Sequence, residues 1–325
     1  MRNERITYLD ALRGFAILLV VIGHLIQSNY QDALSNPIFN IIYSFHMPLF
    51  FFLSGCSRAI SERNITEAKD VKSVTKDVIT KFCSLIIPSV AWTLLVPQFF
   101  CNEITQSSSI SGYWFLNVLF AISVLWSILS LLMTWLRKGW TVVLMTLIGI
   151  IICFIFDIYR IPLVYLLLFL LGYVWQQRSL SEKIPSAVIS VVSVIFLLAV
   201  GKYEYGLSPS GNPDRVWLLL PLSCAASIVL HYVFSKNLLN SKCLILLGRY
   251  SLGIYLCHFF FIHMPMIEWV QHQFSNVLQF FILSLIAVSI SGICVLIQKV
   301  VSQIAWLNGL LYGNWKFLMK NEGGR

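Results

Sequence analysis

The chain alternates long apolar runs with short polar stretches, and this alternation constrains its fold more than any other feature. The first apolar run covers residues 9–28. A run of about 20 apolar residues has the length of a helix that crosses the hydrocarbon core of a bilayer. Only 11% of the residues are charged, whereas soluble domains carry roughly 25%. We therefore expect an all-α integral membrane protein rather than a water-soluble domain.

About ten such runs are separated by polar residues, proline or glycine. They cover residues 9–28, 38–57, 82–101, 113–134, 140–156, 161–177, 185–201, 215–234, 244–263 and 277–300. Residues 58–81 carry mixed charges and are expected to form a helical cytoplasmic connection. Residues 302–319, rich in Trp, Tyr and Leu, are expected to form an interfacial helix at the inner leaflet. We therefore divide the chain into an integral-membrane domain, residues 1–301, and a cytoplasmic interfacial helix and tail, residues 302–325.

The distribution of lysine and arginine predicts the orientation in the membrane. With the N-terminus in the cytoplasm, 20 of the 23 basic residues fall on the cytoplasmic side. Cytoplasmic loops of membrane proteins carry such an excess of positive charge. Both termini are therefore expected in the cytoplasm. The distribution of the basic residues thus makes the net charge of +9 a topology signal, and we expect no nucleic-acid partner.

Ionisable residues lie inside the first two apolar helices. They belong to the segments YLDALRGFAILLVVIGH and IIYSFHMPLFFFLSG, and are Asp10, Arg13, His24 and His46. An ionisable side chain is costly to keep at membrane depth, so each is a candidate functional residue.

Asp10, Arg13 and His24 share one face of the first predicted helix. Eleven residues separate Arg13 from His24, which is three turns plus about 20°, and about 16 Å along the axis. Asp10 precedes Arg13 by three residues and can pair with its guanidinium. This face is polar at both ends, as expected for the wall of a cavity that crosses the membrane.

Two further histidines are expected at a depth similar to that of His24. His46 lies on the second predicted helix, and His258 ends the segment SLGIYLCH in the outer half of the ninth. Three histidines at one level suit either a catalytic or proton-handling centre, or a haem or metal site. The eight cysteines show no CxxC or Cys/His metal spacing, so we expect packing roles for them and no metal.

Acyl transfer to a hydroxyl is the chemistry that fits these residues. An alcohol becomes a good nucleophile when a base removes its proton, and imidazole has a suitable pKa. His24 is the expected base or transient acyl carrier. Arg13, oriented by Asp10, is expected to hold an anionic acyl donor, because guanidinium matches phosphate geometry.

Other functions remain open on the residues alone. A transporter of an anion or of a lipid-linked sugar suits a basic inner face, although no repeat relates two halves of the chain. A bis-histidine haem protein would take its axial ligands from His24 and His46. A purely structural scaffold would not need three polar residues on one face of the first helix.

The two N-terminal segments resemble the first two helices of the acyltransferase-3 family, integral-membrane O-acyltransferases that modify sugars. FHMPLFFFLSG is most similar to the fucose 4-O-acetylase-like branch. SLGIYLCH resembles a late-helix motif of the family, and YWFL at Tyr113–Leu116 its Trp-Phe-Leu element. The resemblance extends over the whole chain.

The resemblance implies a bacterial inner-membrane enzyme with ten helices and no permanently bound cofactor. It implies acetyl transfer from cytoplasmic acetyl-CoA to a surface polysaccharide or its lipid-linked precursor. Membrane lipids are expected to surround the protein. The family's basic-x10-His element matches Arg13 and His24, which implies donor positioning for Arg13 and catalysis for His24.

The remaining site residues follow from the same resemblance. Paired arginines that often enter the family's third helix are replaced here by Lys81 and Ser84, so Lys76 and Arg58 are alternative donor contacts. On the acceptor side we expect four aromatic side chains, His46, Trp114, Tyr255 and His258. Trp114 is a candidate for stacking on a sugar ring.

Overall fold

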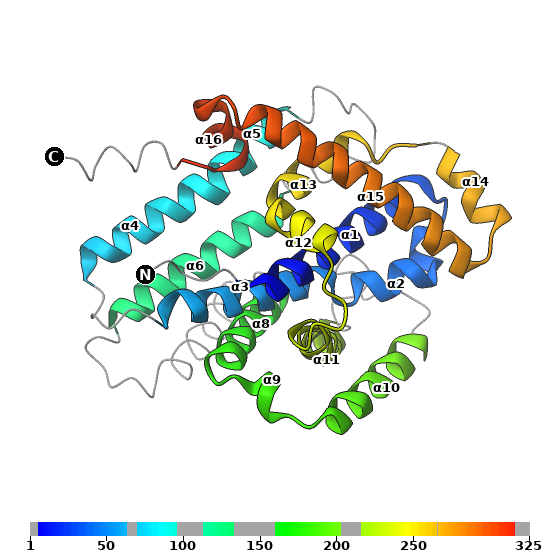
Figure 1. Ribbon diagram of the computed structural model, residues 1–325, viewed down its shortest axis with the longest axis horizontal. Coiled ribbons are helices and arrows are strands. Elements are labelled where there is room, and N and C mark those ends of the chain that lie inside the picture. Colours follow the sequence, from blue (N-terminus) through cyan, green and yellow to red (C-terminus); the bar gives the residue numbers. More distant parts are fainter. Residues whose placement is uncertain are drawn as a thin grey trace. The chain divides into compact units, whose positions relative to one another are not determined.

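The computed structural model describes residues 6–63, 70–95, 113–132, 160–202, 216–264 and 266–315. Every regular element in these ranges is a helix, as the sequence predicts (Figure 1). Internal contacts divide the chain into two compact units. The first unit comprises Met1–Thr66, Ile148–Ser251 and Phe261–Ser291. The second comprises Glu67–Leu147, Leu252–Phe260 and Gly292–Arg325.

The first unit is built around the N-terminal helix. Its elements are α1 (Thr7–Asn29), η1 (Ala33–Ser35), α2 (Pro37–Tyr43), α3 (His46–Glu62), α8 (Arg160–Gln177), α9 (Leu180–Lys183), α10 (Ser186–Lys202), α11 (Val216–Ser235), α12 (Lys242–Arg249) and α14 (Met266–Gln273). Helix α15 (Asn276–Val301) contributes to both units. Helix α1 packs against α3, α11 and α12, and most of its residues are buried. The candidate residues of α1 are thus held inside a helical core.

The second predicted span is broken into α2 and α3, and Pro48 explains the break. A proline in a helix clashes with the carbonyl four residues before it, which here belongs to Ser44. The backbone leaves the helical region at Phe45, with φ −148°. The Ser44 carbonyl instead accepts a hydrogen bond from the Ser223 hydroxyl of α11, at 2.8 Å. The break therefore places His46 at the first position of a new helix.

Helices α3 and α8 pack closely at a pair of glycines. A Cβ on Gly55 would lie 1.9 Å from the Phe169 carbonyl oxygen, and one on Gly172 would lie 2.0 Å from that of Phe52. Small residues allow two membrane helices to bring their backbones together in this way. The Cys56 thiol donates to the Gly172 carbonyl at 3.3 Å across the same contact. This crossing fixes α3, and with it His46.

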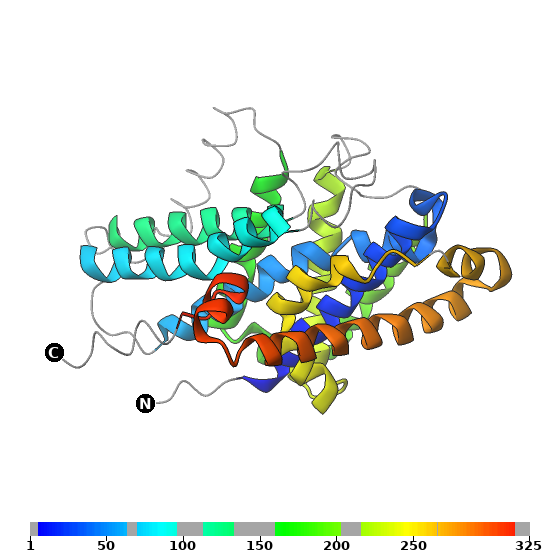
Figure 2. The same ribbon diagram turned by 90° about the horizontal axis from the view of Figure 1, so that it is seen from above.

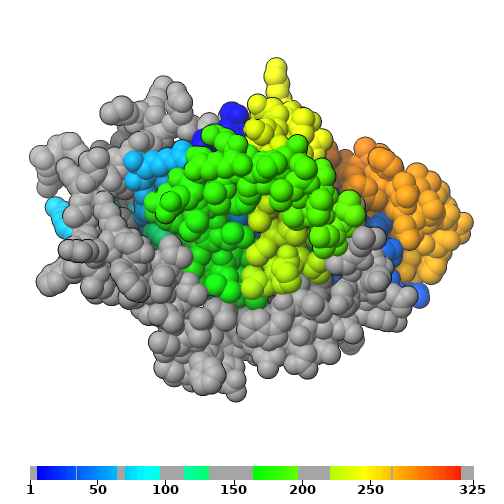
Figure 3. Space-filling view, turned by 90° about the horizontal axis from the view of Figure 1, so that it is seen from below, coloured from blue at the N-terminus to red at the C-terminus, as the bar shows by residue number. Residues whose placement is uncertain are grey.

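Helix α10 turns apolar side chains outward on the first unit. Figure 3 shows the face formed by α8 to α11 in green and yellow-green. The exposed apolar side chains of α10 are Val188, Val191, Val194 and Ile195. An exposed apolar face on an apolar helix is expected where lipid tails replace water.

The second unit contains a long helix with one irregular turn. It runs from α4 (Val71–Lys81) through the π-helical segment η2 (Phe82–Ile86) to α5 (Ile87–Leu95). Pro88 accounts for the irregular turn, because its ring excludes the carbonyl of Ser84, four residues before it. The nearby carbonyl of Cys83 accepts a hydrogen bond from the Trp315 indole at 3.0 Å.

The other elements of this unit are α6 (Trp114–Leu132), α13 (Ser251–Cys257), η7 (His258–Phe260) and α16 (Ala305–Tyr312). Helices α4 and α6 lie side by side (Figure 2), joined by a hydrogen bond from the Ser127 hydroxyl to Asp77 at 2.7 Å. Helix α16 packs against α5, and Trp92 of α5 donates to the Leu311 carbonyl at 2.7 Å. Residues 302–315 of the predicted tail are therefore integrated into this unit.

Five helices in the described ranges are long and apolar enough to cross a membrane. They are Thr7–Asn29, Pro37–Glu62, Val71–Leu95, Trp114–Leu131 and Asn276–Val301. Helices α8, α10 and α11 coincide with three further predicted spans and have shorter apolar described parts. The predicted span 140–156 lies outside the described residues. The chain is a membrane protein, while its ten spans and its orientation stay predictions.

Two boundaries differ from the sequence prediction. The third helix begins at Val71 rather than at residue 82, because the Asp70 carboxylate caps it by accepting from the Ser73 backbone N–H at 2.8 Å. That hydrogen bond lowers the pKa of Asp70. The predicted single span 244–263 is instead interrupted at Tyr250, whose φ of −105° and ψ of 11° end helix α12. The helical segments on either side, Lys242–Arg249 and Ser251–Phe260, are bent by 66°.

Candidate active site

Asp10 and Arg13 form the predicted ion pair at the start of α1. The Arg13 Nη1 donates to Asp10 Oδ1 at 3.1 Å. Arg13 Nη2 also donates to the Ser57 hydroxyl of α3. The Asp10 side chain is 1% exposed and that of Arg13 is 27% exposed. A buried carboxylate needs a partner of opposite charge, and Arg13 meets this need while its guanidinium stays accessible.

A second arginine, Arg249, reaches the same carboxylate from α12. Its Nε lies 3.6 Å from Asp10 Oδ2, and its side chain is 45% exposed. The approach depends on two glycines at the crossing of α1 and α12. A Cβ on Gly14 would lie 1.9 Å from the Leu244 carbonyl oxygen, and one on Gly248 would lie 1.7 Å from that of Asp10. Asp10 is therefore shared between two guanidinium groups.

His24 lies on the same helix, eleven residues after Arg13, in a group of polar and aromatic side chains. The ring of Tyr43 meets it edge-on, with centroids 6.5 Å apart and planes at 75°. The Tyr43 hydroxyl donates to Gln27 Oε1 at 2.6 Å. The Gln27 side chain also hydrogen-bonds the His24 ring. Tyr43 and Gln27 thus hold His24 in a defined orientation.

His46 belongs to the same group, and Tyr43 lies between the two histidines. The Tyr43 and His46 ring centroids are 4.6 Å apart, and Phe39 stacks on Tyr43 at 3.8 Å. The His46 Nδ1 lies 2.8 Å from the Ile42 carbonyl oxygen, so it carries the proton and donates. The other ring nitrogen, Nε2, is then the acceptor. His24 and His46 thus both contact Tyr43, while their similar depth in the membrane stays a prediction.

The third histidine belongs to the second unit. His258 is fully buried, and its Nδ1 donates to the Ile254 carbonyl at 2.9 Å, as in His46. Tyr255 contacts it with ring centroids 6.2 Å apart. Trp114 is partly exposed at the first position of α6, where its ring meets that of Phe115 edge-on. A common level for all three histidines, and the acceptor roles of these residues, stay predictions.

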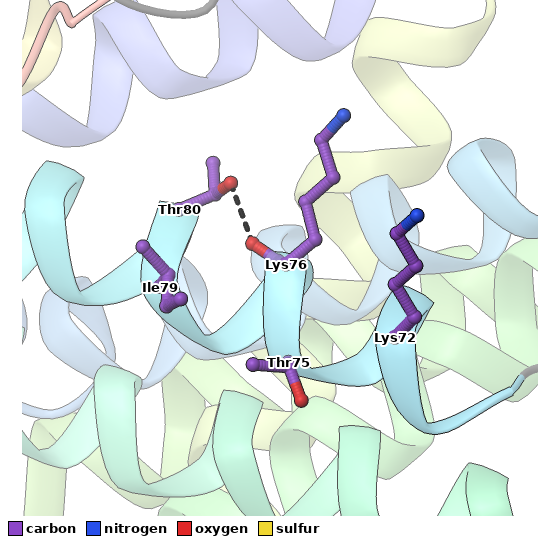
Figure 4. A pocket seen from close by; sticks show the side chains of 5 residues that line it. All are labelled: Lys72, Thr75, Lys76, Ile79 and Thr80. Carbon is purple, nitrogen blue, oxygen red and sulfur yellow. Dashed lines mark hydrogen bonds between the residues drawn. The ribbon is translucent and has the colours of Figure 1, made fainter. Parts of the chain in front are cut away.

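The predicted donor cations differ in their surroundings. Arg58 forms an ion pair with Glu62 at 2.8 Å, and its side chain is 13% exposed. Lys76 lies on the outer face of α4, where it lines a shallow groove with Lys72 (Figure 4). The side chains of Lys72 and Lys76 extend in the same direction, away from Thr75 (Figure 4). Lys81 is partly exposed at the end of α4, before the π-helical segment.

Three residues of this site were not predicted from sequence. Gln27 follows His24 by three residues, which places it on the same helix face, and that spacing is a usable signal. Tyr43 also precedes His46 by three residues, but the break at Ser44 and Phe45 separates their helices, so this spacing is no signal. Arg249 lies 239 positions after Asp10, and no local sequence pattern links the two residues. Within the described ranges, no three His, Cys, Asp or Glu side chains gather as metal ligands do.

The amino-acid sequence that carries this site is similar to those of known proteins. The profile of the acyltransferase-3 family, described as an acyltransferase domain, matches residues 6–296. Nodulation protein NolL of Sinorhizobium fredii (strain NBRC 101917 / NGR234) is 30% identical over 154 residues, which are 41% of this chain and 39% of that protein. Nodulation protein NolL of Mesorhizobium japonicum (strain LMG 29417 / CECT 9101 / MAFF 303099) is 39% identical over 98 residues, 29% of this chain and 24% of that protein. The chain thus spans less than half the length of these relatives, and no solved structure matches it significantly.

Proposed function

This chain belongs to the acyltransferase-3 family, and we propose that it is a membrane O-acetyltransferase. It transfers acetyl from cytoplasmic acetyl-CoA to a sugar hydroxyl of a surface polysaccharide, an O-antigen or an exopolysaccharide, or of its lipid-linked precursor. One observation carries the proposal: an oriented histidine and a buried, arginine-bound carboxylate lie on one face of α1. We place the enzyme in the bacterial inner membrane, with ten spans and both termini in the cytoplasm.

His24 acts as the general base in this proposal. It removes the proton of the sugar hydroxyl while the oxygen attacks the thioester carbonyl of the donor. The tetrahedral oxyanion then collapses, the carbon–sulfur bond breaks, and His24 returns the proton to the departing CoA thiolate. The orientation supplied by Gln27 and Tyr43 supports this role, because a base must be aimed at the proton that it removes.

His46 supports the same step from the start of α3. The positive end of the helix macrodipole lies at this N-terminus and favours negative charge nearby, such as that of the oxyanion. With its proton on Nδ1, His46 presents an accepting Nε2, which suits contact with a second hydroxyl of the sugar. Trp114, Tyr255 and His258 complete the acceptor contacts in this proposal.

The donor enters at the other end of α1. Arg13 lies about 16 Å from His24 along the helix axis. The pantetheine arm of CoA is a long flexible chain, so phosphates held near Arg13 leave the thioester free to reach His24. Lys76, Lys81 and Arg58 are further donor contacts in this proposal, and Lys76 is the most exposed of them.

Glycan mass tests the proposed function. Cells that carry the gene are expected to show an increment of one acetyl group per polysaccharide repeat unit, and cells without it are expected to lack this increment. The same cells test the alternative function, a transporter. A transporter would redistribute a lipid-linked sugar or an anion across the membrane and leave glycan mass unchanged. Purified protein supplied with radiolabelled acetyl-CoA and acceptor then tests the donor directly.

Changing Tyr43 to phenylalanine tests how His24 is oriented. This substitution removes only the hydroxyl that holds Gln27, so kcat is expected to fall about five- to tenfold, the equivalent of one hydrogen bond of about 1 kcal/mol. The KM for acetyl-CoA is expected to stay unchanged, because the donor binds at the other end of α1. Steady-state kinetics with purified protein measure both constants.

The matched control for this variant is Tyr30→Phe. Tyr30 also donates to a glutamine at 3.1 Å in the same unit, but this glutamine, Gln279, belongs to α15 and not to the helix that carries His24. Its kcat is expected to stay within about twofold of the wild type. Equal losses of kcat in the two variants, or a rise in KM for Tyr43→Phe, would contradict the positioning role.

A further inference from the structure

We propose that Arg249 and Arg13, held by Asp10, form the site that binds a phosphate group of the acyl-CoA donor. This inference rests on the proposed function and extends it to a residue on α12. The site lies within the first unit, where α1 and α12 run side by side (Figure 1).

The position of Arg249 depends on the backbone contact of two helices rather than on a flexible loop. Gly14 and Gly248 meet at this contact, and a side chain at either position would overlap the opposite backbone. Arg249 follows Gly248 directly, so the crossing fixes its Cα beside Asp10. The guanidinium is thereby brought to a carboxylate that already carries Arg13.

The guanidinium groups of this cluster reach the surface of the protein. Two of them approach one carboxylate, that of Asp10. Asp10 is almost fully buried, whereas the side chains of Arg13 and Arg249 are 27% and 45% exposed. The buried carboxylate therefore holds the two arginines on their inner side, and part of each arginine side chain faces outward. Arg58 differs, because it forms an ion pair with Glu62 in which both side chains are less exposed.

Phosphate is the anion that suits such a pair. Guanidinium groups present N–H donors in a planar fork that matches two phosphate oxygens, and such charge-assisted hydrogen bonds are stronger than neutral ones. A CoA molecule carries phosphates at one end and its thioester at the other. With the phosphates at this cluster, its arm extends along the α1 face toward His24, about 16 Å away.

Binding of CoA to the purified, lipid-reconstituted protein tests this inference without turnover. Arg249→Ala is expected to weaken CoA binding by roughly 10- to 100-fold, the value of a hydrogen bond to a charged group. Arg249→Lys is expected to bind with intermediate affinity, because lysine keeps the charge and loses the fork. Isothermal titration calorimetry in bilayers of zwitterionic lipid measures these affinities.

Lys242→Ala is the matched control. Lys242 is exposed on the same helix, two turns before Arg249, and its removal also takes away one positive charge. Its CoA affinity is expected to stay within about twofold of wild type. Equal weakening in both variants would mean that only net charge matters, and would overturn the proposed site.

Pantetheine separates phosphate binding from a structural effect. It lacks every phosphate of CoA, so wild type and Arg249→Ala are expected to bind it with the same low affinity. A loss of pantetheine binding in Arg249→Ala, or unchanged CoA binding, would overturn the role of Arg249. Wild-type protein that binds no CoA would overturn the proposed donor itself. Selective loss of co-purified phosphatidylglycerol in Arg249→Ala, with CoA binding intact, would assign the cluster to a lipid headgroup and overturn the donor site.

Discussion

Replacing His24 by alanine is expected to abolish acetyl transfer while the protein remains folded in the membrane. A positioned general base contributes about 10²- to 10⁴-fold to rate, so kcat is expected to fall at least about 100-fold. The protein is expected to keep its fold, because His24 is only partly buried and the core of α1 consists of its apolar neighbours. The measurements are acetyl incorporation by purified protein and glycan mass in complemented cells.

His272→Ala is the control for this variant. His272 is an exposed histidine of α14 in the same unit, outside the site. It is expected to retain wild-type activity and glycan acetylation. Retained activity in His24→Ala would remove His24 from the mechanism. Inactivity combined with loss of membrane-inserted protein would assign His24 a structural role instead.

A single methyl group at Gly55 is expected to destabilise the protein strongly. In Gly55→Ala the new Cβ would lie 1.9 Å from the Phe169 carbonyl oxygen, and no side-chain movement can relieve a clash with backbone. Helices α3 and α8 must separate, which costs about 1–3 kcal/mol or more. The expected result is a clear fall in the apparent melting temperature in detergent, measured by tryptophan fluorescence or by size-exclusion chromatography after heating.

Gly292→Ala makes the same chemical change in open space. Among the described residues, no atom outside this stretch of α15 lies within 4 Å of a Cβ built at this position. Because alanine favours a helix over glycine by about 1 kcal/mol, this variant is expected to be as stable as wild type or more stable. The two alanines are thus expected to act in opposite directions. Equal melting temperatures for the two variants would show that α3 and α8 are farther apart at Gly55 than the 1.9 Å approach implies.

The sequence predicted the helices whose causes are local. The apolar run of α1 and the spacing of Asp10 and Arg13 set a helix and an ion pair on one of its faces, because residues three apart are neighbours on a helix. The same spacing rule holds for Gln27 and His24. The membrane class follows from composition in the same way, since a chain with so few charged residues is unlike a water-soluble domain.

The helix boundaries that the sequence did not predict depend on which hydrogen-bond partners the backbone groups find. The predicted span 38–57 lies within the candidate span Pro37–Glu62, but Pro48 excludes the Ser44 carbonyl and interrupts the helix between α2 and α3. The break is stable because Ser223, far along the chain, supplies the missing hydrogen bond. Similarly, Asp70 starts α4 well before the apolar residues of the predicted third span begin.

The sequence by itself determined an all-helical membrane protein with an ionisable face on its first helix, because hydrophobicity and helical spacing act locally. Only the tertiary structure decided which side chains complete that face. Tyr43 reaches His24 because the chain breaks after α2, and Arg249 reaches Asp10 because Gly14 and Gly248 let two backbones touch. Such contacts join residues that are distant in sequence, and the close packing that selects them leaves no periodic pattern along the chain.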